Sequence, residues 1–178
     1  HIDLVAYQVT FVIPAEVTTS ATIAHNQNAA TDKSLTVRGL GPDRNIGRFL
    51  GEIDDASKWH DVIPTFVDVQ FMQEDDALLT ANRGQGFGVS VAVEYPRKAK
   101  RKVVAYLQDL IGSAYRMNGA VHLTKNVPLD PADVADKQCN DDWLEFYKLK
   151  KQYDPLGAVS SPFLEEIFKN TNAPRSCK

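Results

Sequence analysis

The sequence predicts an α+β fold in which a mainly antiparallel sheet is flanked by helices on one face. Two long segments, residues 4–13 and 87–95, alternate apolar and polar side chains, which is typical of half-buried strands. Directly after the second segment, residues 98–117 carry apolar side chains at spacings of three and four, which indicates an amphipathic helix. Strands that cluster without regular helical crossovers favour an antiparallel or mixed sheet.

The same patterns predict the remaining elements. They are strands at 66–72 and 120–124, a helix within 41–64, and a second amphipathic helix at 141–152. Gly119 is expected to end the helix at 98–117, and Asp130 followed by Pro131 is a typical helix start. Residues 34–40 fit a short strand, and residues 15–34 fit either a loop or a weakly amphipathic helix.

The length of 178 residues predicts one domain, with boundaries at 1–168 and a loose tail at 169–178. Hydrophobic residues make up 43% of the chain, enough to build a core. The sequence begins at His1 without a methionine and enters a strand pattern almost at once. We therefore expect a processed product or a piece of a longer protein.

Charge and hydropathy argue against two classes of partner. The formal net charge of −3 does not favour bulk binding to nucleic acid or to an anionic membrane. The main basic cluster, "RKAKRK" at 97–102, is not accompanied by aromatic residues on which bases would stack. No apolar run approaches the roughly 20 residues that a membrane-spanning helix needs. We expect neither a nucleic-acid partner nor a membrane span.

The cysteines and histidines give no metal pattern. Cys139 and Cys177 do not form a C-x-x-C pair, so a zinc site is not expected. One disulfide between them would tie down the tail, but nothing in the sequence requires it. The redox compartment, and with it the localisation, stays open between cytoplasmic and periplasmic or secreted.

The segment "AVHLTKN", residues 120–126, is the candidate site. It places His122 and Lys125 at the end of an apolar strand. One interpretation is a strand that emerges into solvent; the other is a strand tip that delivers a cation to a binding site. Residues three apart in a regular strand face opposite sides, so the two side chains converge only if the strand ends or bulges between them.

The C-terminal third resembles a known family. "GAVHLTKNVPLDPADVADKQ" and "WLEFYKLKKQYDPLGAVSSPFLEEIF" are similar to the end of the vanillyl-alcohol-oxidase type of FAD-linked oxidoreductases. In that family a strand tip bears a lysine, and a helix with a "W…F…K…DP" pattern and a "DP-G" turn follow. The tip is similar to that of the aldonolactone and alditol oxidase branch and of decaprenylphosphoryl-ribose oxidase. Upstream, "YQVTFVIP" and "VSVAVEYP" resemble strands of the family's substrate-binding (cap) domain. Two departures stand out: Leu123-Thr124 replaces an aromatic-glycine pair, and no Gly-rich FAD-binding loop is present.

The resemblance implies the substrate-binding domain of an enzyme that oxidises an alcohol, sugar or lactone hydroxyl. It implies that FAD is bound mainly by a separate N-terminal FAD-binding domain, so that this chain alone is inactive. By the same resemblance Lys125 and Asn126 would contact the cofactor, and Lys125 and His122 would take part in catalysis. A fixed ammonium there would stabilise negative charge on the flavin, and His122 could accept the hydroxyl proton.

A stand-alone, non-catalytic ligand-binding or interaction domain is the alternative. The sequence does not distinguish an oxidase from a dehydrogenase, and it does not identify the substrate.

Overall fold

The computed structural model describes residues 4–15, 44–74, 81, 84–123, 128–138, 141–159, 161, 162 and 165. The elements in chain order are β1 (Leu4–Pro14), α1 (Arg44–His60), β2 (Phe66–Met72), β3 (Gly86–Pro96), a 3₁₀ turn η1 (Arg97–Ala99), α2 (Lys100–Arg116), β4 (Ala120–Val121), α3 (Pro131–Lys137) and α4 (Asp141–Tyr153). The predictions for residues 15–34 and 34–40, apart from Ala15, and for the tail at 169–178 fall outside the described residues.

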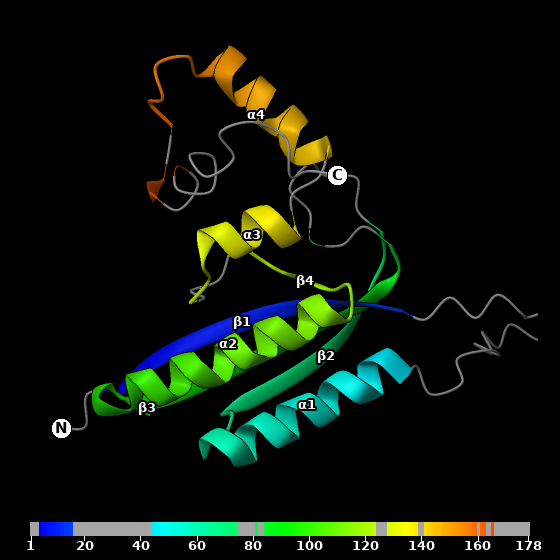
Figure 1. Ribbon diagram of the computed structural model, residues 1–178, viewed down its shortest axis with the longest axis vertical. Helices are drawn as coiled ribbons and strands as arrows, with labels where there is room; N and C mark the ends of the chain where they lie inside the picture. Colours follow the sequence, from blue (N-terminus) through cyan, green and yellow to red (C-terminus); the bar gives the residue numbers. More distant parts are fainter. Residues whose placement is uncertain are drawn as a thin grey trace, which may run out of the picture.

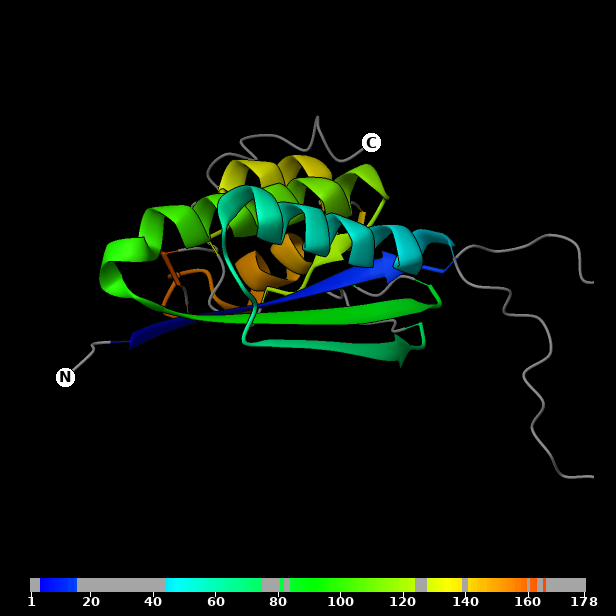
Figure 2. The same cartoon turned by 90° about the horizontal axis from the view of Figure 1, so that it is seen from below.

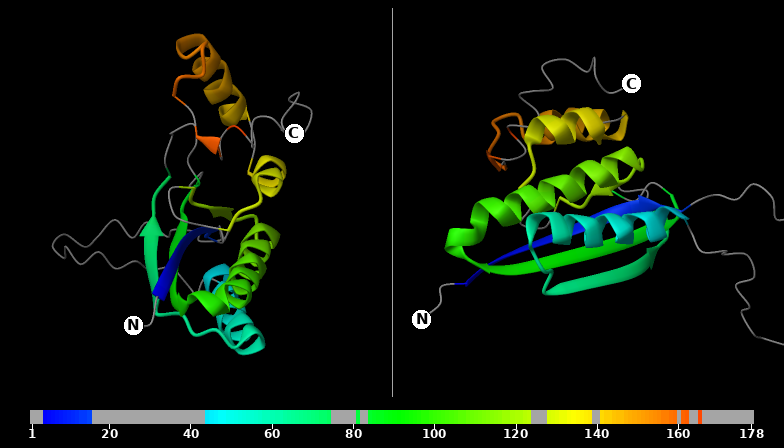
Figure 3. Two further views of the ribbon diagram at one scale, coloured as in Figure 1. Left: turned by 90° about the vertical axis from the view of Figure 1, so that its left-hand side faces the viewer. Right: turned by 60° about the horizontal axis from the view of Figure 1, so that its bottom comes forward.

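The four strands form one antiparallel sheet in the order β2-β3-β1-β4. Helices α1 and α2 pack side by side on one face of this sheet (Figures 1 and 2). Helices α3 and α4 lie beyond the edge that β4 forms (Figures 1 and 3). The predicted α+β class, with an antiparallel sheet and helices on one face, is therefore confirmed.

The core lies between the sheet and the two covering helices. It comprises the odd-numbered side chains of β1 and β3, such as Phe11 and Val91, together with Phe49 of α1 and Leu110 of α2. The rings of Phe11 and Phe49 meet edge to face, with centroids 5.1 Å apart. Burial of each such side chain contributes about 1.5–3 kcal/mol, so this layer holds the helices on the sheet.

The connection between α2 and β4 differs in detail from the prediction. The helix ends at Arg116, and Asn118, with φ of 56°, takes the left-handed conformation that Gly119 was expected to supply. Gly119 instead allows a close approach, because a Cβ atom on it would lie 2.6 Å from the carbonyl oxygen of Val12 and 2.9 Å from that of Ala114. The Gly119 N–H donates to the Ala114 carbonyl at 2.8 Å, which closes the turn.

Strand β4 is shorter than predicted, because it ends at Val121 and not at Thr124. The His122 N–H still donates to the Thr10 carbonyl at 2.8 Å, so the N–H and C=O of Val121 point away from β1. The side chain of Gln138 meets both: its Oε1 accepts from the Val121 N–H at 3.0 Å and its Nε2 donates to the Val121 carbonyl at 3.1 Å. A single side-chain amide thus takes the place of a further strand, and the chain turns at Leu123.

Helix α3 begins as the sequence predicts. The Asp130 side chain accepts a hydrogen bond from the Ala132 N–H at 2.8 Å, and Pro131 is the first helical residue. Gln138 follows directly after this short helix, and its Oε1 also accepts from the Tyr115 hydroxyl at 2.8 Å. The cap at Asp130 therefore helps to position the residue that closes the β4 edge.

Replacement of Gln138 by Met tests this edge closure. The variant keeps the size of the side chain but leaves the Val121 N–H and C=O and the Tyr115 hydroxyl without their partner. We expect the free energy of unfolding to fall by about 1–3 kcal/mol. The matched control is Gln152→Met, since Gln152 is exposed on α4; it should change stability by less than about 0.5 kcal/mol. Chemical denaturation measures both, and equal effects of the two variants would contradict this role of Gln138.

Candidate functional site

The face of the sheet that α1 and α2 leave uncovered is the candidate functional site. Phe11 points toward the helices, so its neighbour Thr10 points to the opposite face, here called the open face. His122 lies directly opposite Thr10 in the antiparallel register and therefore shares the open face with it. The structure thus places one of the three predicted site residues on a definite surface.

Lys125 and Asn126 lie outside the described residues. Strand β4 ends at Val121, and the chain turns at Leu123. The roles of Lys125 and Asn126 stay predictions.

A row of polar side chains crosses the open face in line with His122. The strand registers place Thr10 opposite Ser90 and Ser90 opposite Asp68. The two hydroxyls lie 2.9 Å apart, and Gln70 Nε2 donates to Asp68 Oδ2 at 2.7 Å. Here the name polar row denotes Asp68, Ser90, Thr10 and His122. Asp68, Ser90 and Thr10 lie on β2, β3 and β1, and His122 directly follows β4. The polar row therefore offers hydrogen-bond donors and acceptors across the whole width of the sheet.

The open face is uneven beside the polar row. Ala92, next to Ser90 on β3, and Ala6, further along β1, have small side chains. Gly88, on the other side of Ser90, is buried under Met72, whose sulfur would lie 2.5 Å from a Cβ atom on that glycine. The face is therefore more open on the side of Ser90 where Ala92 lies. Sequence reasoning identified His122 but missed Thr10, Ser90 and Asp68. These three residues stand at even-numbered positions of the alternating strands, so the sequence does indicate that they share one face within each strand. It does not show which strands are neighbours, and therefore it does not show that the three side chains form a row.

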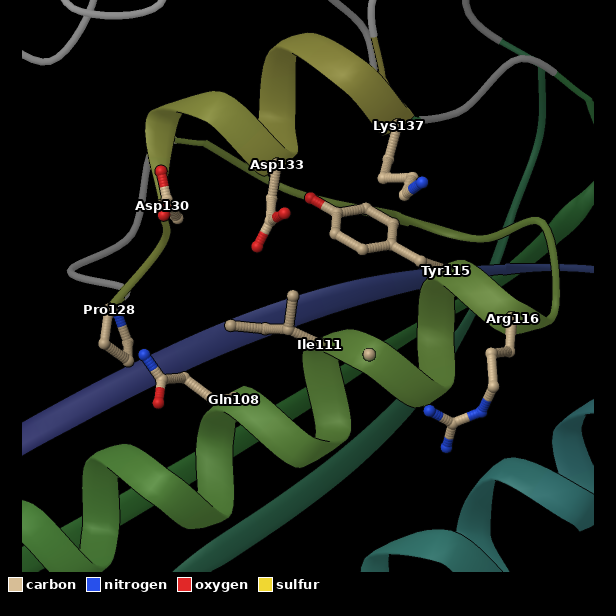
Figure 4. Close-up of a pocket in the computed structure, with 9 residues that line it drawn as sticks. Gln108, Ile111, Tyr115, Arg116, Pro128, Asp130, Asp133 and Lys137 are labelled. Atoms are coloured by element: carbon tan, nitrogen blue, oxygen red, sulfur yellow. The ribbon is translucent and has the colours of Figure 1, made fainter.

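A separate pocket of about 490 Å³ lies between α2 and α3, in the helical layer (Figure 4). Ile111 forms an apolar part of its wall, and Tyr115 and Asp133 point into the same space from α2 and α3. Burial, and to a smaller extent the charge of Asp133, raise the pKa of the Tyr115 phenol, so Tyr115 stays protonated and donates to Gln138. Lys137 adds positive charge at the rim, whereas the Arg116 guanidinium points away toward α1, where it lies 3.5 Å from Glu52 (Figure 4).

The family-like residues at the end of α4 form a structural turn. Lys150 Nζ donates to Asp154 Oδ2 at 2.7 Å, and the same carboxylate accepts from the backbone N–H of Ala158 and Val159 at 2.7 and 3.0 Å. Gly157 takes a φ of 68° in this turn. The hydrogen bond from Lys150 is the main reason that the pKa of Asp154 is lowered. These residues end the helix and fold the chain back, and none of them lies on β1–β4.

The basic cluster forms an exposed start to α2. Arg97 to Lys102 are mostly exposed, and Lys102 Nζ donates to Asp61 Oδ2 at 2.5 Å. In the part of the chain that the structure describes, no three His, Cys, Asp or Glu side chains gather as a metal site would require. Within the same residues no helix is both long and apolar enough to cross a membrane.

The sequence matches no protein-family model and no curated protein.

Asp154→Asn tests the turn after α4 and its dependence on pH. The pKa of Asp154 is lower in the folded protein than in the unfolded chain, where it is about 3.9. The ionised carboxylate therefore stabilises the fold above the unfolded pKa, and this stabilisation is lost as the pH falls through the folded pKa. We expect the variant to unfold at a lower temperature than wild type at pH 7, and the difference to shrink at pH 3. Thermal unfolding followed by circular dichroism at both pH values measures this. A difference that persists unchanged at pH 3 would show that the charge of Asp154 is unimportant.

Proposed function

We propose that this chain is the substrate-binding (cap) domain of an FAD-dependent oxidoreductase that oxidises an alcohol, sugar or lactone hydroxyl. The observation that carries the proposal is the uncovered sheet face with its polar row, which has His122 at the end of β4. The resemblance of the C-terminal third to the vanillyl-alcohol-oxidase type of enzymes supports it from the sequence. In this proposal the partner is an FAD-binding domain of the same protein.

The open face fits one side of a flat, polar ring system. The small side chain of Ala92 leaves the sheet surface low beside Ser90, while the hydroxyls of Thr10 and Ser90 supply donors and acceptors there. When FAD is bound, its chemistry is acceptance of a hydride from the substrate carbon. Because no phosphate cradle lies among the described residues of the open face, the proposal assigns the main hold on the cofactor to another domain.

The residues of this chain would bind and orient the substrate hydroxyl. His122, on the open face, is suited to accept the hydroxyl proton, because a neutral imidazole has one ring nitrogen that is an acceptor. Thr10 and Ser90 can donate to further substrate oxygens. Lys125 would place a fixed positive charge next to the negative charge that develops as the hydride leaves. Together these groups would favour an alkoxide-like substrate.

The pocket between α2 and α3 supports the alternative function, a stand-alone ligand-binding or interaction domain. Its volume of about 490 Å³ lies in the range of small-molecule sites. It lies in the helical layer and not on the open face, so ligand binding there would be independent of the polar row. Mapping a bound ligand to Tyr115 and Asp133 instead of Thr10 and His122 would favour this alternative.

The first test of the proposal concerns cofactor retention. Because the described surface holds no phosphate cradle, the isolated chain should not retain stoichiometric FAD after purification. Absorbance of the purified chain near the flavin bands, compared with protein concentration, measures this. A chain that carries one FAD per molecule would contradict the idea that the cofactor is held mainly elsewhere.

Lys125→Ala in the full-length enzyme tests the catalytic role. Loss of a fixed charge at a developing anion typically slows a reaction about 10²- to 10³-fold, so we expect flavin reduction to slow at least about a hundredfold. We expect the free energy of unfolding to change by less than about 0.5 kcal/mol. His122→Ala should slow the same step less, because water can take the hydroxyl proton whereas it cannot replace a fixed cation.

Lys98→Ala is the matched control, since Lys98 is an exposed lysine in the helical layer. It should reduce flavin at the wild-type rate. Stopped-flow measurement of flavin reduction compares the three variants. A wild-type rate for Lys125→Ala would leave Lys125 as an ordinary solvated residue after the strand.

A further inference from the structure

The two edges of the sheet are protected differently. At the β4 edge, the outward-facing N–H and C=O of Val121 are satisfied by the side chain of Gln138. At the opposite edge, formed by β2, no strand among the described residues pairs with the outer side (Figures 1 and 2). An unpaired strand edge is a template for pairing with another chain.

The hydrogen-bond pattern identifies which backbone groups of β2 face outward. Thr10 exchanges its backbone hydrogen bonds with β4, so Ser90, which lies opposite Thr10, directs its own backbone groups to β2. Ser90 pairs with Asp68, and by alternation Val67, Val69 and Phe71 direct their N–H and C=O groups to the outer edge. These three residues form what is here called the β2 edge.

The side chains of the β2 edge are apolar and exposed. Val67 is 41% exposed, Val69 42% and Phe71 53%, and Phe66 on the other face is 51% exposed. The strand contains neither proline nor lysine, which commonly prevent edge pairing, and Asp68 is its one charged residue. An exposed apolar edge of this kind is suited to cover by another strand.

The sequence of β2 is complementary to itself. In "FVDVQFM" the polar residues Asp68 and Gln70 are placed symmetrically about Val69, with apolar residues outside them. If two copies pair antiparallel about Val69, Val67 lies opposite Phe71 and Asp68 lies opposite Gln70. An aromatic side chain then meets a β-branched one, and the carboxylate meets an amide donor and not its own like charge.

We propose that the β2 edge is a docking surface for a second copy of this chain, with the two β2 strands antiparallel about a two-fold axis through Val69. The pairing uses the outward backbone groups of Val67, Val69 and Phe71, because in this register each opposes a residue that also faces outward. It joins the two four-stranded sheets into one continuous sheet. The open face, the helical layer and the β4 tip are left uncovered by the pairing itself.

A charge at Val69 tests the proposed symmetry, because Val69 of one copy faces Val69 of the other. Wild-type chain should dimerise in a concentration series measured by sedimentation velocity. Val69→Lys places two like charges opposite each other and should weaken the dimer at least about tenfold. Val69→Glu should do the same. An equimolar mixture of the two variants should restore dimers, because lysine then faces glutamate.

The matched control is Leu4→Lys, which places the same charge at an exposed apolar residue of β1, 55% exposed and away from the β2 edge. It should dimerise like wild type, and circular dichroism should show the same fold for all variants. Wild-type chain that stays monomeric throughout the series would overturn the proposal. So would Val69→Lys that dimerises like wild type, or a mixture of the lysine and glutamate variants that stays monomeric.

Discussion

The pairing of β1 with β3 is the constraint on which the rest of the structure depends. It runs in one register from Leu4 opposite Pro96 to Pro14 opposite Gly86. Because strand side chains alternate, this register sends Phe11 and its odd-numbered neighbours to the helices and Thr10 to the open face. A slip by one residue would move the apolar set into solvent, so burial of the core and the position of the polar row are fixed by the same pairing.

The two faces of the sheet consequently serve different purposes. The helical face is covered by α1 and α2 over β1 and β3 and contributes most of the burial on which stability depends. The open face carries the polar row at its centre, and these side chains are not part of the core cluster, so they are free to bind a ligand. The proposed function uses this face, while the β2 edge lies at its border and could bring two such faces together in one sheet.

The C-terminal residues show why a family-like pattern is not by itself a site. Lys150, Asp154 and Gly157 match the expected "K…DP-G" pattern, and in the structure they terminate α4 and fold the chain back. In this chain the pattern therefore indicates the end of a helix and not a binding site. The proposed function depends on the open face and on His122, which lie elsewhere in the fold.

The sequence by itself determined β1 and β3, the change of period into α2, and the helix start at Asp130, because each depends on neighbouring residues whose spacing matches a strand, a helix or a cap. Only the tertiary structure decided the strand order, the early end of β4 at Val121, the edge closure by Gln138 and the polar row. Thr10 and Ser90 illustrate the reason: their hydroxyls lie 2.9 Å apart although 80 residues separate them along the chain. Alternation predicts which side chains share a face within one strand, but contacts between strands follow from packing of the whole core.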